Sequence, residues 1–211
     1  MSRFNSPIAI SLLAACWLLT IGLCMNGLAR YSSTPSGTEV LPGHLPADSR
    51  IHTDPQRATL LVFLHPHCPC SRATVSELDR LLSQVSGRVN AYAIVIHPAG
   101  TSSDWYRTTL WHQVSGIRDL TTIVDTGCEL TRRCRATVSG QTLLYGADGA
   151  LQFRGGITVA RGHEGDSPGR SSILSFLGLL PEATESPEAE CAVFGCPLFQ
   201  TSVSDWQGEL Q

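Results

Sequence analysis

The pattern of apolar and polar positions separates a long apolar N-terminal segment from a polar stretch and then a series of alternating strands and helices. From Pro7 to Leu28 no residue is charged, and about 20 apolar residues are enough to cross a bilayer. We therefore expect residues 1–29 to form a transmembrane anchor or a signal segment, and we favour the retained anchor. Residues 30–57 are rich in Pro, Ser, Gly and Asp and have no apolar period, which predicts a flexible linker.

Ordered structure is expected to begin at Ala58–Leu64, a continuous apolar run typical of a strand buried on both faces. The following segment has apolar residues near helical spacing, with Ser71 as its N-cap. Further along, the sequence predicts a strand at 89–97, a helix at 102–114, a strand at 121–126, a short helix at 128–136, a hairpin around GADG within 142–158 and a helix at 169–180. This β-α-β-α-β-α-β-β-α order predicts an α/β fold with a mixed sheet, helices on both faces and an antiparallel edge. The domain is placed at residues 58–181, with an acidic linker and a cysteine-containing tail at 182–211.

Composition narrows the chemistry that this chain can perform. All 15 basic residues are Arg, and the formal net charge is −3. The lack of Lys excludes Schiff-base chemistry and a P-loop lysine, and without a basic block the sequence gives no indication of a nucleic-acid partner. Eight Cys in 211 residues is a high count, so cysteine chemistry is expected.

The stretch LHPHCPCSRA, from Leu64 to Ala73, places two cysteines between a predicted strand and a predicted helix. A helix N-terminus lowers the pKa of a thiol from about 8.5 into a range of about 3.5–7.5. We interpret Cys68 as a nucleophile and Cys70 as its resolving thiol, although the reverse order is open. His65 and His67, if protonated, would stabilise a thiolate further. A disulfide across the single residue Pro69 would be strained and therefore comparatively oxidising.

A buried strand, a cysteine pair and a helix in this order resemble the thioredoxin-like fold, and the resemblance covers about residues 58–180. The segments HPHCPCSRA, SGQTLLYGADGALQFRGGIT, RGHEGD and VFGCPLF resemble bacterial membrane-anchored redoxins of the RedB-like type. The resemblance implies a thiol–disulfide oxidoreductase with protein thiol and disulfide partners and no cofactor. A single anchor this close to the N-terminus also implies a domain on the extracytoplasmic side of the membrane.

Two positions depart from the thioredoxin pattern. The redox motif of that family is C-x-x-C, whereas this sequence has C-x-C at Cys68-Pro69-Cys70. The cis-proline that faces the cysteines is replaced by Gly140, after Ser139. By this resemblance we assign Ser139 and Gly140, together with His65, His67 and Pro69 of the cysteine motif, to the substrate groove and to activation of the thiols. Because Gly has no side chain, we expect a more open groove there, which His163 or a tail thiol such as Cys196 could enter, and we expect Gly140→Pro largely to spare the fold.

Two alternative functions, each of another class, stay open. The same cysteines could hold Cu(I), a metal that favours thiolates, with Cys68, Cys70, His67 and His163 as ligands. The chain could also be a catalytically silent module that binds a partner near Gly140, with its cysteine pair as a static disulfide or as buried thiols. The loop ARGHEGD at 160–166 could either line the site or be an ordinary polar surface loop.

The remaining cysteines give weaker signals. Cys128 and Cys134 cannot pair if the segment between them is helical, because a helix would separate them by about 9 Å. Cys191 and Cys196 lie close together in the tail and could form a disulfide across AVFG. The two cysteines of the N-terminal segment, Cys16 and Cys24, are expected to be inert apolar residues.

Overall fold

A computed structural model describes residues 7–37, 41–180 and 187–199 of the chain. It divides into two compact units, residues 1–34 and residues 35–211, which are described separately. The parts of the predicted linker and tail that fall on residues 38–40, 181–186 and 200–211 lie outside the described residues.

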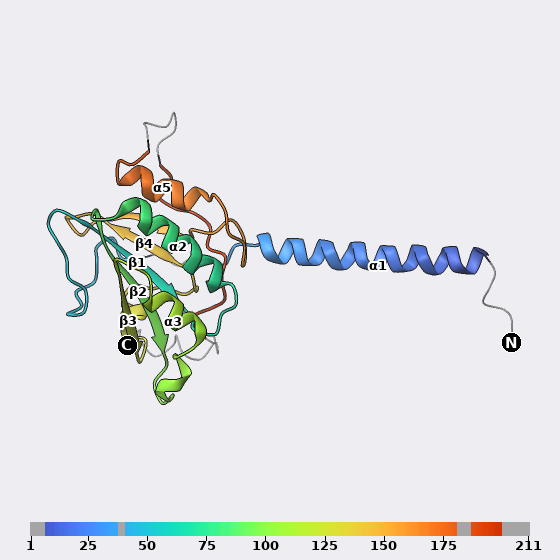
Figure 1. Ribbon diagram of the computed structural model, residues 1–211, viewed down its shortest axis with the longest axis horizontal. Coiled ribbons are helices and arrows are strands. Elements are labelled where there is room, and N and C mark those ends of the chain that lie inside the picture. Colours follow the sequence, from blue (N-terminus) through green and yellow to red (C-terminus); the bar gives the residue numbers. More distant parts are fainter. Residues whose placement is uncertain (1–6, 38–40, 181–186, 200–211) are drawn as a thin grey trace, which may run out of the picture. The chain divides into compact units, whose positions relative to one another are not determined.

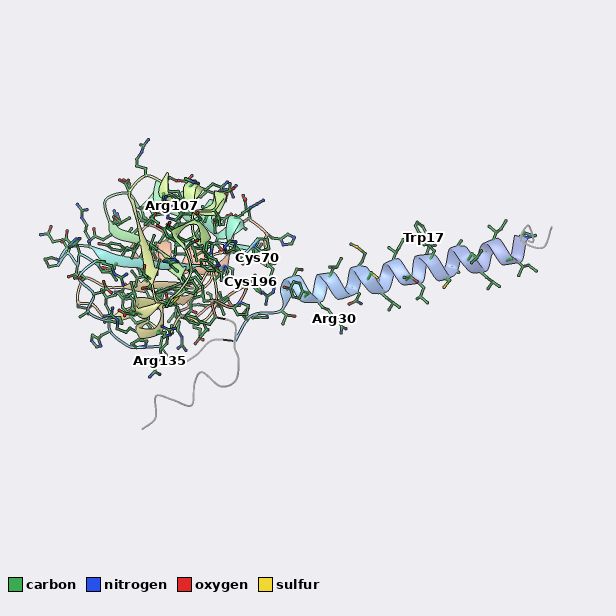
Figure 2. All side chains as sticks on the ribbon, turned by 90° about the horizontal axis from the view of Figure 1, so that it is seen from below. Trp17, Arg30, Cys70, Arg107, Arg135 and Cys196 are labelled. Carbon is green, nitrogen blue, oxygen red and sulfur yellow. The ribbon has the colours of Figure 1, made fainter. Side chains whose placement is uncertain are left out.

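The first unit is a single helix, α1 (Pro7–Ser33), of 27 residues. Figure 2 shows its side chains all around the helix, with Trp17 near the middle and Arg30 close to one end. Within the described ranges, α1 is the one helix that is long and apolar enough to cross a membrane. A signal sequence near the N-terminus can pass the same test of length and composition, so this helix is compatible with either form of the N-terminal segment.

The second unit is built on one mixed sheet of five strands (Figure 1). Its strands are β1 (Ala58–Leu64), β2 (Val89–His97), β3 (Leu120–Thr126), β4 (Thr142–Tyr145) and β5 (Leu151–Gly155), in the order β3-β2-β1-β4-β5. Strands β1, β2 and β3 are parallel, and β4 and β5 are antiparallel to their neighbours. The predicted element order and the antiparallel edge are therefore confirmed.

Helices cover both faces of this sheet. The helices α2 (Ser71–Val85), α3 (Thr109–Ser115) and α5 (Pro168–Phe176) contribute to one apolar core, and α4 (Glu129–Arg133) contributes to the other. Alternate residues of β1 enter the two cores: Leu60 and Val62 face the first, and Leu61 and Phe63 face the second. Because an apolar core covers each face of the sheet, the side chains on both faces of β1 are buried, which explains its nearly continuous apolar sequence.

Two predicted helices differ in detail from the structure. The segment expected to form one helix at 102–114 contains a short 3₁₀ helix, η1 (Ser103–Trp105), and then α3. Thr108 separates them: its backbone is extended, and its hydroxyl accepts a hydrogen bond from the Trp111 amide. In α2 the N-cap is Cys70 and Ser71 is the first helical residue, so the helix begins one position earlier than expected.

Residues before β1 lie on the domain rather than apart from it. Leu41 and Ile51, from the segment expected to be a flexible linker, are buried in the second core. The same segment pairs with the hairpin between β4 and β5, because the Leu45 amide donates to the Gly149 carbonyl and the Leu151 amide donates to the Gly43 carbonyl, both at 2.9 Å.

The described part of the C-terminal tail also packs on the domain. The Cys191 amide donates to the carbonyl of Arg154 in β5 at 3.0 Å, and the Gly156 amide donates to the Ala192 carbonyl at 3.2 Å. Val193 and Leu198 are buried. The tail thus runs beside β5 and continues toward the segment that precedes β4.

Candidate functional site

The C-x-C motif forms two tight turns between the end of β1 and the start of α2. The Cys68 amide donates to the His65 carbonyl at 3.0 Å, and the Ser71 amide donates to the Cys68 carbonyl at 3.2 Å. Cys70, the N-cap of α2, has helical backbone angles and makes no side-chain cap hydrogen bond. Both thiols are therefore close to the positive end of the helix dipole, as the sequence predicts.

A third thiol joins this pair. The sulfur atoms of Cys68, Cys70 and Cys196 lie within 4.8 Å of one another, and we call these three residues the thiol cluster. Figure 2 shows Cys70 and Cys196 close together. The Cys68 and Cys196 sulfurs are 2.7 Å apart although the residues are 128 positions apart in the chain. Cys68 is 5% exposed, whereas Cys70 and Cys196 are partly exposed.

Cys196 is carried by residues 193–198, an irregular segment with isolated β-bridges at Val193 and Pro197, which we call the tail strand. It pairs antiparallel with the segment before β4, with Pro197 opposite Val138. The Ser139 amide donates to the Cys196 carbonyl, and the Leu198 amide donates to the Thr137 carbonyl, both at 2.8 Å. These backbone hydrogen bonds fix the position of the Cys196 side chain over the cysteine turn.

The opposite side of the tail strand is also held. The Ser36 amide donates to the Val193 carbonyl at 2.9 Å, and the Ser36 hydroxyl donates to the Gly195 carbonyl at 3.0 Å. The Arg161 guanidinium donates to the same Gly195 carbonyl. At Gly195 the backbones are so close that an added Cβ would lie 1.8 Å from the Ser139 carbonyl oxygen, so only glycine fits here.

Ser139 links the cysteine turn to the tail strand. Its hydroxyl lies 2.7 Å from the Ser71 hydroxyl and accepts a hydrogen bond from the His65 amide at 2.8 Å. The structure thus brings His65 and Ser139, two residues that the sequence assigned to the substrate groove, into one hydrogen-bonded network. His67 and Pro69, from the same predicted set, are exposed at the rim.

The three thiols have different pKa values. Burial acts to raise the pKa of Cys68, but hydrogen bonds from the Cys196 thiol and from Ser71 outweigh it, so the pKa of Cys68 is lowered. A thiolate can only accept hydrogen bonds, so Cys196 is the donor when Cys68 is ionised. Burial and the negative charge of Cys68 raise the pKa of Cys70. Burial and the hydrogen bond to Cys68 raise the pKa of Cys196 to about 12. The cluster therefore favours a single thiolate, on Cys68.

The surroundings of His65 disfavour its protonated form. Burial, followed by repulsion from His67, lowers its pKa. Its Nδ1 accepts a hydrogen bond from the His67 amide at 3.1 Å, which requires an unprotonated Nδ1. The His65 and His67 rings also pack edge-to-face on Trp105, with centroids 5.4 and 4.8 Å from the indole. The hydrogen bonds of Cys196 and Ser71, rather than a charged His65, stabilise the Cys68 thiolate.

Gly140 is buried and has a positive φ of 93°. Its amide donates to the Phe63 carbonyl at 2.7 Å, and an added Cβ would lie 2.9 Å from the Thr74 hydroxyl. Proline requires a φ near −65° and has no amide hydrogen. The expectation that Gly140→Pro would spare the fold is therefore wrong. The groove expected to be open beside Gly140 is instead occupied by the tail strand, and Cys196 is the residue that approaches the cysteine pair.

His163 is not part of the thiol cluster. Its Nδ1 lies 2.7 Å from the Arg161 carbonyl oxygen. The loop around it is held to α2 by the buried Glu77, which accepts from the Gly165 amide at 2.8 Å and pairs with Arg170 at 3.1 Å. Glu164 pairs with Arg80 at 3.0 Å. The charged groups of this loop thus have structural partners.

The other cysteines of the second unit are free thiols. Cys128 and Cys134 are buried at the two ends of α4 and do not pair, as predicted from their spacing. Cys191 and Cys196 were expected to be able to form a disulfide, but both are free in the structure. The Cys191 sulfur lies 3.5 Å from a Glu188 carboxylate oxygen, whereas Cys196 contacts Cys68, because the tail between them follows β5 and then crosses to Ser139.

Comparison with known proteins gives the fold. No family model matches the chain, and no curated protein matches it. A hypothetical protein from Sinorhizobium meliloti 1021 is 17% identical, with a TM-score of 0.59, and the match covers 80% of this chain and 99% of that one. An uncharacterized conserved protein from Geobacillus kaustophilus is 20% identical, with a TM-score of 0.61 and coverages of 80% and 96%. A secreted disulfide oxidoreductase from Mycobacterium tuberculosis is 14% identical, with a TM-score of 0.42 and coverages of 59% and 83%, a likeness too low to support any inference about activity.

The strand order, the antiparallel β4–β5 edge and the cysteine turn between β1 and α2 define a thioredoxin-like fold. The site on this fold is a cluster of three thiols at the amino end of α2, with one thiol supplied by the C-terminal tail.

The pKa pattern predicts the pH dependence of alkylation. Only a thiolate reacts with iodoacetamide, so the rate at each cysteine rises with pH through its pKa. The midpoint for Cys68 should lie below that of a free cysteine, about 8.5, while Cys70 and Cys196 should react only at higher pH. Ser71→Ala and Cys196→Ala remove hydrogen bonds that stabilise the Cys68 thiolate, so each should move its midpoint to higher pH. Mass spectrometry of each cysteine-containing peptide would measure these midpoints.

Ser83→Ala, near the other end of the same helix, is the matched control and should leave the Cys68 midpoint unchanged. A midpoint for Cys68 at or above the free-cysteine value would contradict the assignment of the thiolate to Cys68.

Proposed function

We propose that this chain is a thiol–disulfide oxidoreductase that acts through Cys68 and Cys70. The observation that carries the proposal is a buried thiol of lowered pKa at a helix N-terminus, with a second thiol two residues away. Thiolates are the attacking species in disulfide exchange, and this arrangement is a known means of producing one at neutral pH. The resemblance of the motif segments to RedB-like redoxins agrees with this class.

The exchange proceeds in two balanced steps. The Cys68 thiolate attacks one sulfur of a partner disulfide, a Cys68–partner disulfide forms, and the second partner sulfur leaves as a thiolate that takes up a proton. Cys70 then loses its proton and attacks the Cys68 sulfur. The Cys68–Cys70 disulfide forms, and the first partner sulfur leaves as a thiolate. The partner gains two electrons and the dithiol loses two.

The expected partners are proteins with exposed disulfides or thiols. His67 and Pro69 are exposed beside the reactive turn, where a partner chain could contact them. Because a bridge across one residue is strained, the Cys68–Cys70 pair should be a comparatively strong oxidant.

A redox titration of the purified full chain in detergent micelles tests this function. The wild type should titrate against glutathione as a two-electron couple, about 30 mV per tenfold change in ratio, and should reduce insulin disulfides with dithiothreitol as donor. Cys68→Ser should lower the insulin rate to the uncatalysed level, because the nucleophile is removed. A variant that carries both Cys70→Ser and Cys196→Ser should accumulate mixed disulfides with partner proteins, because no second thiol of the cluster is left to resolve them.

Cys191→Ser, which changes a cysteine of the tail outside the thiol cluster, is the control and should retain the wild-type rate. If Cys68→Ser reduced insulin as fast as the wild type, the proposed function would have to be abandoned.

A second candidate function, Cu(I) binding, is favoured by one observation. Three thiol sulfurs within 4.8 Å of one another form a soft ligand set that suits Cu(I). A structural zinc site takes four ligands, and within the residues that the structure describes the metal-ligating group contains only these three cysteines. His67 and His163, the other ligands suggested by the sequence, are not in this group.

Competition with a chromogenic Cu(I) chelator tests this candidate. The reduced chain should withdraw one Cu(I), and Cys196→Ser should weaken the affinity at least about tenfold, because one soft ligand of three is lost. Cys191→Ser should bind like the wild type. A reduced wild type that withdraws no Cu(I) would rule out a copper chaperone without affecting the redox proposal.

We also propose that α1 is retained as a single-pass membrane anchor, with the second unit on the extracytoplasmic side. The support is its 27-residue length and its uncharged sequence from Pro7 to Leu28. The full-length protein should remain in the membrane fraction after an alkaline carbonate wash, because a spanning helix is held by the bilayer and not by surface charge. A soluble mature protein whose first residue lies near Arg30 would show instead that the segment is a cleaved signal.

A further inference from the structure

The tail strand presents a difficulty for simple exchange at Cys68. With residues 193–198 in place, Cys68 is only 5% exposed. An external disulfide therefore cannot reach its sulfur without displacement of the tail strand. The residue that covers Cys68 is itself a cysteine, Cys196, and its sulfur is 2.7 Å away.

The backbone pairing of the tail strand is that of a peptide added to a strand edge. The amide of Ser139 and the carbonyl of Thr137 bond on either side of the Val138–Pro197 pair. Such strand addition is a general mode of binding for extended peptides, in which the main chain supplies the hydrogen bonds. The tail strand thus occupies the edge formed by residues 137–139, which we call the docking edge.

The sequence of the tail strand suits this edge. In an antiparallel pair, residues directly opposite each other alternate between hydrogen-bonded and non-hydrogen-bonded pairs. The bonds of Ser139 and Leu198 flank the Val138–Pro197 pair, so that pair is of the non-hydrogen-bonded kind. A residue in such a pair does not donate to the opposite strand, so Pro197, which has no amide hydrogen, loses no hydrogen bond to this edge. Proline also favours an extended conformation at the preceding residue, Cys196.

We propose that Cys196 is a third redox thiol of this site, and that the tail strand is a displaceable cover that holds Cys196 on Cys68 in the resting protein. This inference rests on the proposed thiol–disulfide exchange at Cys68. The geometry that carries it is the pairing of the tail strand with residues 137–139, which places the Cys196 sulfur on the Cys68 sulfur.

The exchange within the chain needs no external oxidant, because one disulfide bond forms as another breaks. In the oxidised protein, Cys196 loses its proton and its sulfur attacks the Cys68 sulfur of the Cys68–Cys70 disulfide. The Cys68–Cys196 bond forms, the Cys68–Cys70 bond breaks, and Cys70 leaves as a thiolate that takes up the proton. A disulfide bond is about 2.05 Å long, so the sulfurs at 2.7 Å need little movement to bond.

Strain favours this rearrangement. The bridge across Pro69 closes a small ring, whereas Cys68 and Cys196 are 128 positions apart and are brought together by the fold. The oxidised protein should therefore store its disulfide as Cys68–Cys196, with the tail strand covalently held on the docking edge. A dithiol donor that is itself oxidised to a disulfide returns both sulfurs to thiols, and the tail strand can then give way to a substrate.

Disulfide mapping of the full chain in detergent micelles tests this assignment. The protein is equilibrated with oxidised glutathione, its free thiols are alkylated, and the peptides are analysed by mass spectrometry without reduction. The wild type and Cys191→Ser should show the Cys68–Cys196 link with Cys70 alkylated. Cys196→Ser should show Cys68–Cys70 instead, and its equilibrium with glutathione should move at least about tenfold toward the reduced form, because only the strained bridge remains.

A backbone substitution tests the tail strand as a cover separately. In Gly195→Ala the added methyl would lie 1.8 Å from the Ser139 carbonyl oxygen, so the tail strand must leave its place. With the edge free, kcat/KM for a cysteine-containing peptide disulfide should rise roughly tenfold, in proportion to the open fraction, and the Cys68–Cys196 link should be lost. Gly37→Ala is the matched control, since an added Cβ there meets nothing within 4 Å.

The outcomes separate this inference from the function on which it rests. A wild type that reduces insulin but maps to Cys68–Cys70 or Cys191–Cys196, with no Cys68–Cys196 link, keeps the proposed function and rejects the role of Cys196. An unchanged kcat/KM in a folded Gly195→Ala variant rejects the tail strand as a displaceable cover. Full activity in Cys68→Ser rejects the function itself, whatever the map of the other cysteines.

Discussion

The position of the reactive thiols depends on the complete burial of β1. Every residue of this strand is buried, with β2 paired on one side, β4 on the other and an apolar core on each face. A strand held in this way has no freedom at its carboxyl end, so the turn that leaves it starts from a fixed point. Cys68 and Cys70 lie in that turn, and α2 begins directly after it. The packing of an apolar strand thus places two thiols at a helix N-terminus.

The same constraint brings the tail strand to the cysteines. Because β4 is antiparallel to β1, the segment before β4 lies beside the end of β1, where Phe63 bonds to Gly140 and Gln141. A strand that pairs with residues 137–139 must therefore lie over the cysteine turn. Gly195 permits the close backbone approach, and Arg161 and Ser36 hold the far side. The third thiol reaches Cys68 through backbone pairing rather than through attraction between the sulfurs.

The ionisation of the cluster bears on the choice between its two candidate chemistries. Disulfide exchange needs one thiolate, and the cluster favours one, on Cys68. A Cu(I) site needs thiolates as ligands, so binding would have to displace protons from Cys70 and Cys196, whose pKa values are raised. Without metal, the arrangement of protons is that of an exchange site, with Cys196 as a hydrogen-bond donor to the attacking sulfur.

The sequence by itself determined the order of the elements, the mixed sheet and the location of Cys68 and Cys70 between a strand and a helix, because these features follow from local periodicity. It also excluded a Cys128–Cys134 pair, since that argument needs only the rise of a helix. It did not determine the partner of Cys196, the lowered pKa of His65 or the positive φ of Gly140. Each of these depends on groups distant in sequence: the Ser139 edge, the burial of the imidazole and the Phe63 carbonyl. Only the tertiary structure decided them, because hydrogen bonding and burial between distant segments leave no periodic signal in the chain.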